Sequence, residues 1–128
     1  MDLGLQGRVA VVAAASKGLG RAVAEELARE GASVAICARS ASELEQAAVH
    51  IQKSTGREVL HQAVDVTNSG AISQFVAAVE QRFGRIDICV TNSGGPPSKL
   101  FVDTNPEDWR AAVDLLLMST AFFAKETL

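Results

Sequence analysis

The stretch AAASKGLG, Ala13 to Gly20, decides the fold of this 128-residue chain. It follows an apolar run, Arg8 to Ala14, that is typical of a strand buried on both faces. After it, Leu19, Val23 and Leu27 recur at the spacing of an amphipathic helix. A buried strand joined to a helix by a short glycine-containing loop is the first unit of a parallel α/β sheet.

The same alternation continues along the rest of the chain. Further strands are expected over 33–39, 57–66 and 85–91, and further helices over 40–56, 68–84 and from 105 onward. Ser40 and Glu43 have capping-box spacing, and Asn68 or Ser69 is placed to cap the third helix. The pattern predicts one domain over residues 1–128: a doubly wound parallel α/β sheet in the strand order 3-2-1-4.

The composition argues against several classes of function. A net charge of −3, with Lys and Arg scattered among acids, is not typical of a protein that binds nucleic acid. No apolar run reaches the roughly 18 residues that a membrane span needs. The N-terminus also lacks the basic start and apolar core of a signal peptide. We therefore expect a cytoplasmic protein without a membrane partner.

The cysteines and histidines are interpreted as structural. Cys37 and Cys89 lie in expected strands on opposite sides of the first strand, about 9.5 Å apart. That separation exceeds the limit of ~7 Å for a disulfide, so we expect none. His50 and His61 have no partner at metal-ligand spacing, and no metal site is expected.

The loop after the first strand is a candidate phosphate site. Unpaired N–H groups and the positive end of a helix dipole attract a pyrophosphate at such a place, and glycine lets it come close. The candidate residues here are Ala14, Ser16, Lys17, Gly18, Leu19 and Gly20. An ordinary tight turn between strand and helix explains these residues equally well, so the loop alone leaves both interpretations open.

Polar residues at three other strand ends favour the phosphate interpretation. Arg39, followed by Ser40, ends the second strand, where an arginine favours the 2′-phosphate of NADP(H) over the 2′-OH of NAD(H). Asp65 and Val66 end the third strand, next to the expected place of an adenine, and Asn92, Ser93 and Gly94 follow the fourth. Parallel strands end at one edge of the sheet, so we expect these residues to lie together. A solvated surface arginine and a helix-entry aspartate remain the plainer alternatives.

Together these motifs resemble the N-terminal half of the short-chain dehydrogenase/reductase family. The family's Thr-Gly-x-x-x-Gly-x-Gly loop falls on 13–20, its Asp after the third strand on Asp65, its Asn-Asn-Ala-Gly on 91–94, and its Asp-x-Trp helix start on EDW at 107–109. Lys17 and Arg39 resemble the NADP-preferring members, which include 3-oxoacyl carrier-protein reductases. The resemblance implies hydride transfer between NADP(H) and a carbonyl or alcohol, on a small-molecule or acyl-carrier-linked substrate.

The departures from the family concern catalysis. The family uses a Ser and a Tyr-x-x-x-Lys, but this chain contains no tyrosine. The family's Asn on the helix after the fourth strand falls on Leu116. We therefore expect no catalytic residue in this chain, which we interpret as the cofactor-binding fragment of a longer reductase, inactive alone. The alternative is a non-catalytic nucleotide-binding or dimerisation module.

The double alanine in the loop raises two further expectations. The family's Thr hydroxyl ties the first strand to the fourth, and Ala13 lacks it, so we expect Thr91 to restore that bond from the fourth strand. Ala14 replaces a glycine, and it is tolerable if its φ is negative and its methyl points away from the pyrophosphate.

The last helix is expected to be buried on two faces. It carries apolar residues on nearly every side, including Leu115, Leu116, Leu117 and Phe123. One face is expected to cover the sheet and the other to meet further chain or a second subunit. The family commonly assembles through this helix, which implies a homo-oligomer through residues 105–128. Trp109 is interpreted as a packing anchor one turn before Val113.

Overall fold

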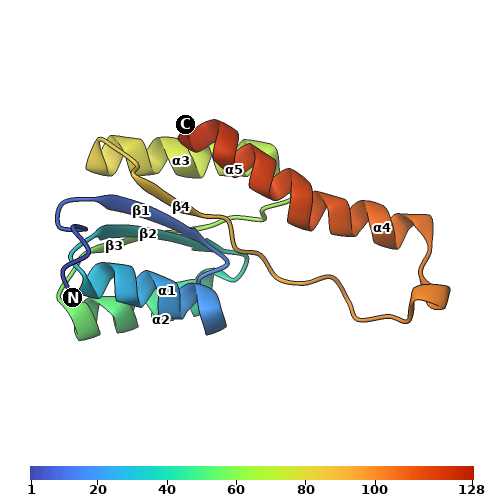
Figure 1. Cartoon of the computed structure of the whole chain (residues 1–128), viewed down its shortest axis with the longest axis horizontal. Coiled ribbons are helices and arrows are strands. Elements are labelled where there is room, and N and C mark those ends of the chain that lie inside the picture. Colours follow the sequence, from blue (N-terminus) through green and yellow to red (C-terminus); the bar gives the residue numbers. More distant parts are fainter.

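Four strands lie side by side and run parallel in the order β3-β2-β1-β4, as the sequence predicts. The computed structural model describes all 128 residues (Figure 1). The strands are β1 Val9–Ala13, β2 Ser33–Ala38, β3 Val59–Ala63 and β4 Ile88–Val90. The helices are α1 Gly18–Arg29, α2 Ala41–Thr55, α3 Ser69–Phe83, a 3-10 turn Phe101–Asp103, α4 Pro106–Val113, a π-helical turn Asp114–Met118, and α5 Ser119–Thr127.

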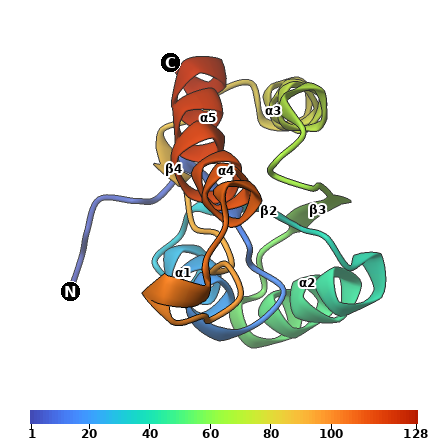
Figure 2. The ribbon, with the colours of Figure 1, turned by 90° about the vertical axis from the view of Figure 1, so that its right-hand side faces the viewer.

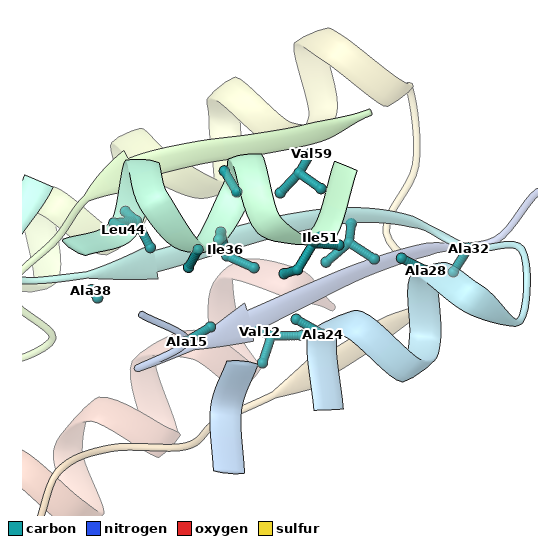
Figure 3. Packing of buried hydrophobic residues seen from close by; sticks show 13 residues of the cluster. Val12, Ala15, Ala24, Ala28, Ala32, Ile36, Ala38, Leu44, Ile51 and Val59 are labelled. Atoms are coloured by element: carbon teal, nitrogen blue, oxygen red, sulfur yellow. The ribbon is translucent and has the colours of Figure 1, made fainter. Parts of the chain in front are cut away.

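The sheet has a helical layer on each face. Helices α1 and α2 cover one face and α3 and α5 the other, with the sheet between them in both views (Figures 1 and 2). On the first face, Val12 and Ile36 of the sheet pack against Leu44 and Ile51 of α2, all fully buried (Figure 3). Burial on both faces explains why β1 and β2 are near-continuous apolar runs.

Helix α1 packs through small residues rather than through its large apolar ones. Its buried residues are Gly20, Ala24 and Ala28, whereas Leu19 is 81% exposed and Val23 is 38% exposed. Small side chains let the helix backbone approach the strands closely, which compensates for the small apolar area each residue buries. Of the three residues at helical spacing, Leu27 packs against the core, whereas Leu19 and Val23 lie on the exposed side.

The boundaries of α2 and α3 follow from their caps. The Ser40 side chain accepts a hydrogen bond from the backbone N–H of Glu43, and Asn68 accepts one from Ala71. Both helices end at a glycine in the left-handed conformation, Gly56 with φ +71° and Gly84 with φ +79°. Each of these four caps stands at a position where the sequence predicts a helix end.

The last helix covers the second face only in part. Helix α4, the π-helical turn and α5 form one continuous rod, and Phe123 of α5 is buried against the sheet and α3. On its other side Leu116 is 45% exposed and Leu117 is 62% exposed, so this chain provides no cover for that face. Its burial by further chain or a second subunit stays a prediction. No helix is long and apolar enough to cross a membrane.

The two cysteines are free thiols, as expected from their strands. Cys37 pairs with Ala13 on one side of β1, and Cys89 pairs with Val11 on the other. Burial raises the pKa of the Cys37 thiol to about 12, and it also raises the pKa of Cys89. Both side chains therefore stay protonated and behave as small hydrophobes.

The Asp87 carboxylate links the start of β1 to the start of β4, at the N-terminal ends of the strands. Its carboxylate accepts hydrogen bonds from the Val9 backbone N–H at 2.9 Å, from Arg85 Nε at 2.9 Å and from Arg8 Nη1 at 3.3 Å. These donors favour the ionised form and lower the pKa of Asp87 to about 2. The carboxylate is only 16% exposed, so this clamp lies partly inside the structure.

We expect Asp87 to make the free energy of unfolding depend on pH in the acidic range. Its pKa is about 2 in the folded chain and about 3.9 when unfolded, so its contribution is complete above pH ~4 and is lost as the pH falls toward 2. Urea unfolding across that range should show a steeper loss for the wild type than for Asp87→Asn. The exposed Asp103, whose carboxylate makes no hydrogen bond, provides the control Asp103→Asn. Parallel losses in wild type and Asp87→Asn would contradict this role.

Candidate functional site

The carboxyl ends of the four strands open into a cleft of about 1470 Å³. The cleft continues between α4 and the loop 92–104, which both project beyond this edge of the sheet (Figures 1 and 2). Eleven of the thirteen predicted site residues line it: Ala14, Ser16, Lys17, Leu19, Arg39, Ser40, Asp65, Val66, Asn92, Ser93 and Gly94. The other two, Gly18 and Gly20, belong to the same loop without lining the cleft. Residues from four separate strand ends thus meet in one place.

The first turn of α1 presents free N–H groups to this cleft. Lys17 is the N-cap, with extended backbone, and its side chain makes no capping hydrogen bond. No acidic residue lies in the first turn of the helix. The unpaired N–H groups and the positive end of the helix dipole are therefore available to an anion, with the Lys17 ammonium and the Ser16 hydroxyl beside them.

Gly20 allows the helix to start directly against the end of β1. A Cβ at this position would lie 2.9 Å from the Ala14 carbonyl carbon and 3.0 Å from the Ala15 Cα, with the Ala14 carbonyl oxygen closer still. Real Cβ atoms do not approach backbone so closely. Position 18 requires glycine for a different reason. Its φ of +58° lies in the left-handed region, which glycine adopts without strain.

Ala14 does not meet the condition of a negative φ under which it would replace glycine without strain. Its φ is +50°, and it is the one residue other than glycine with a positive φ in the chain. The methyl group makes this conformation unfavourable by about 1–2 kcal/mol relative to glycine. The surrounding contacts override that local preference, since the loop must turn sharply between β1 and α1.

The link between the first and fourth strand ends is made by Asn92, not by Thr91. Asn92 Nδ2 donates to the Ala14 carbonyl oxygen at 3.3 Å. The Thr91 hydroxyl makes no hydrogen bond in the structure, so the expected restoring bond from Thr91 is wrong. Asn92, two residues beyond the end of β4, thus provides the side-chain link to the end of β1 that the sequence predicts for Thr91.

Arg39 lines the cleft with an exposed guanidinium. It directly follows β2, it makes no ion pair, and α2 begins two residues later. Ser40 caps that helix by accepting a hydrogen bond from the Glu43 N–H at 3.4 Å, and its hydroxyl lies 3.5 Å from the Ser42 hydroxyl. A cation, a hydroxyl and a helix N-terminus therefore lie together at this strand end, and such a group suits a phosphate.

Asp65 is held in its ionised form at the end of β3. Its carboxylate accepts hydrogen bonds from the Thr67 hydroxyl at 2.7 Å and from the Thr67 backbone N–H at 3.0 Å. These bonds lower the pKa of Asp65, and the charge of Arg39 lowers it further. The carboxylate can therefore accept a hydrogen bond from a ligand while it shapes the turn into α3.

The outer wall of the cleft holds residues that the sequence did not single out. Lys99 Nζ donates to both carboxylate oxygens of Asp108 at 2.8 Å, and this ion pair ties the loop 92–104 to α4. Trp109 is 54% exposed and meets the Phe101 ring edge-on at 6.2 Å. Its Nε1 donates to the Thr104 hydroxyl at 3.0 Å. Trp109 therefore anchors this loop to α4, which agrees with its interpretation as a packing anchor.

No residue in the cleft completes a catalytic set of the kind that the sequence resemblance implies. The chain has no tyrosine. Leu116 lies in the π-helical turn and does not line the cleft. The cations, hydroxyls and free N–H groups that line the cleft are groups that suit a ligand with phosphates.

Known proteins resemble the whole of this chain. A family model described as short chain dehydrogenase matches residues 8–128. An uncharacterised oxidoreductase of Staphylococcus saprophyticus is 35% identical over 118 residues, which cover 92% of this chain and 50% of the relative. The chain spans about half the length of the curated relatives it matches.

Solved structures show the same arrangement. L-sorbose reductase of Gluconobacter frateurii, in complex with NADPH and L-sorbose, has a TM-score of 0.94 at 35% identity, covering 99% of this chain and 48% of the other. A variant of actinorhodin polyketide ketoreductase with NADPH has a TM-score of 0.88 at 30% identity, covering 94% of this chain and 46% of the other.

Proposed function

We propose, because this chain belongs to the short-chain dehydrogenase family, that its cleft binds NADP(H) as the cofactor-binding half of an oxidoreductase. The observation that carries the proposal is the meeting of Arg39, Ser40 and the α1 N-terminus at one sheet edge. The family's cofactors are NAD(P)(H), and the structures of two relatives contain NADPH. An exposed arginine at the end of β2 supports NADP(H) over NAD(H), since the 2′-phosphate suits a guanidinium.

The residues present fit such a cofactor. The free N–H groups of the α1 start would hold the pyrophosphate, and Gly20 lets this helix start lie close to the end of β1. Arg39 and Ser40, with Lys17 near them, would hold the 2′-phosphate. Asp65 and Val66 would lie beside the adenine, and the segment 92–94 would support the remaining half of the cofactor.

The activity of the whole protein is part of the same proposal. When bound, the nicotinamide transfers a hydride to a carbonyl carbon or accepts one from an alcohol. This chain binds and orients the cofactor, and it contributes no general acid, because it has no tyrosine and because Leu116 replaces the family's asparagine. The substrate is a small-molecule or acyl-carrier-linked carbonyl compound, and the chain alone does not turn it over.

Leu116 and the double alanine also favour a second candidate. A non-catalytic module that binds a nucleotide, or that only dimerises through its last helix, would need no asparagine at position 116. Such a dimerisation module would not bind NADPH. Nucleotide binding therefore separates the pure dimerisation role from the proposed function.

Calorimetric titration of the chain with NADPH and with NADH tests the proposal. We expect NADPH to bind about ten- to hundredfold more tightly, because charge-assisted hydrogen bonds to the 2′-phosphate contribute about 1.5–3 kcal/mol. Equal affinities would show that Arg39 does not bind a phosphate. Absence of binding by either nucleotide would support the dimerisation module.

A further inference from the structure

The peptide bond between Ala14 and Ala15 is held from both neighbouring strands. Its carbonyl oxygen accepts from Asn92 Nδ2 at 3.3 Å, on the side of β4. Its N–H donates to the Cys37 carbonyl at 3.1 Å, on the side of β2. One peptide plane thus bridges three strands at the base of the loop 14–20, which we call the phosphate loop.

This peptide follows the strained residue of the chain. Alanine occupies the left-handed region roughly five- to thirtyfold less readily than its relaxed conformations. A residue in such a conformation stays there only when its surroundings hold it. The φ of +50° at Ala14 therefore needs an explanation from its contacts.

Among those contacts, Asn92 provides the side-chain hydrogen bond to the Ala14 carbonyl. The bond to Cys37 joins two backbone groups. Gly20 lies close to the Ala14 backbone but forms no hydrogen bond with it. Asn92 is half-buried and belongs to the wall of the cleft. Its side-chain amide is bonded to the Ala14 carbonyl. Removing this amide would leave the peptide held from the β2 side alone, by the Cys37 bond, and would weaken the hold on the conformation of Ala14.

We propose that Asn92 is a positioning residue that holds Ala14 in its left-handed conformation and so keeps the phosphate loop in its binding shape. The effect on ligand affinity rests on the proposed function; the effect on the loop does not. With glycine at position 14 the same conformation needs no support. Asn92 therefore matters to the loop because position 14 carries a methyl group.

A cycle of four proteins tests this dependence: wild type, Ala14→Gly, Asn92→Ala and the double variant. The first measurement is the dissociation constant of 2′,5′-ADP, which carries the 2′-phosphate and the adenine. The second is the exchange rate of the Ala15 amide hydrogen, measured by NMR without ligand. Thr91→Val is the matched control, because the Thr91 hydroxyl makes no hydrogen bond to the loop.

The proposal predicts that Asn92→Ala acts strongly in the wild-type background and weakly in the Ala14→Gly background. We expect the dissociation constant and the Ala15 exchange rate each to rise about tenfold in the first background and about twofold in the second. Thr91→Val should change neither by more than about twofold. If Asn92→Ala does not fold, Asn92→Gln, which displaces the amide by one methylene, takes its place with the same expectation.

The two measurements separate the two proposals. Equal rises of the Ala15 exchange rate in both backgrounds would overturn the positioning role of Asn92, whatever the ligand does. If no protein binds 2′,5′-ADP, the proposed function fails, and a background-dependent exchange rate would still support the positioning role. If Asn92→Ala lowered the affinity equally in both backgrounds and raised the Ala15 exchange rate equally in both, Asn92 would only fill space in the wall of the cleft, and the positioning role would be overturned.

Discussion

Gly20→Ala is expected to destabilise the fold and to abolish nucleotide binding. The added Cβ would lie 2.9 Å from the Ala14 carbonyl carbon and 3.0 Å from the Ala15 Cα, and backbone cannot move aside as a flexible side chain can. Helix α1 would have to shift away from β1, although its residues Ala24 and Ala28 are buried in the core. We expect a loss of about 3 kcal/mol in the free energy of unfolding, measured by urea titration.

A second glycine provides the control for this substitution. Gly70 lies in the first turn of α3, and a Cβ there would meet only the end of the Asn68 side chain at 3.3 Å. Gly70→Ala should be neutral or should stabilise the chain by up to about 1 kcal/mol through helix propensity. If Gly20→Ala retained the wild-type stability and affinity, the close contact between α1 and the end of β1 would not be essential.

Arg39→Asp is expected to reverse the preference between the two nucleotides. The substitution removes a guanidinium that we propose binds the 2′-phosphate, and it places a carboxylate where a ribose 2′-OH can donate to it. The dissociation constant for NADPH should rise about hundredfold or more, because like charges then face each other. The dissociation constant for NADH should stay the same or fall.

Arg110→Asp makes the same charge change at a place away from the cleft. Arg110 is exposed on α4 and pairs only with Glu107 on its own helix. It should leave both dissociation constants within about twofold of the wild type, since screening weakens charges beyond ~10 Å. Matching losses of NADPH affinity in both variants would mean that net charge, and not Arg39 itself, selects the nucleotide.

Local patterns in the sequence were sufficient for most of the architecture. The apolar runs predict the four strands, and cap residues such as Ser40, Asn68 and Gly84 predict the helix ends, because these signals depend on neighbours in the chain. The strand order follows from the handedness of parallel crossovers. Since parallel strands end at one edge, the same reasoning brings Arg39 and Asp65 to one cleft.

Details that depend on contacts between distant segments were not predictable in this way. The positive φ of Ala14 opposes the preference of alanine, and Ala14 is contacted by Asn92, 78 residues away in sequence, and by the close helix start. The buried side of α1 consists of alanines, whose small apolar area gives a weak pattern beside Leu19 and Val23.

The outer wall of the cleft was missed for a related reason. The ion pair between Lys99 and Asp108 and the contact of Phe101 with Trp109 depend on the path of an irregular loop. No periodic spacing marks such pairs. The one available signal was the capping box of Asn105 and Asp108, which fixes the start of α4 and hence the place of Asp108.

The central claim is that NADP(H) binds at the carboxyl edge of this sheet. A titration of the isotope-labelled chain with NADPH, followed by the NMR shifts of its backbone amides, tests that claim most directly. We expect the large shifts to fall within 14–20, 39–40, 65–66 and 92–94. Shifts confined to the outer sides of α2 or α3, or no shifts at millimolar NADPH, would contradict it.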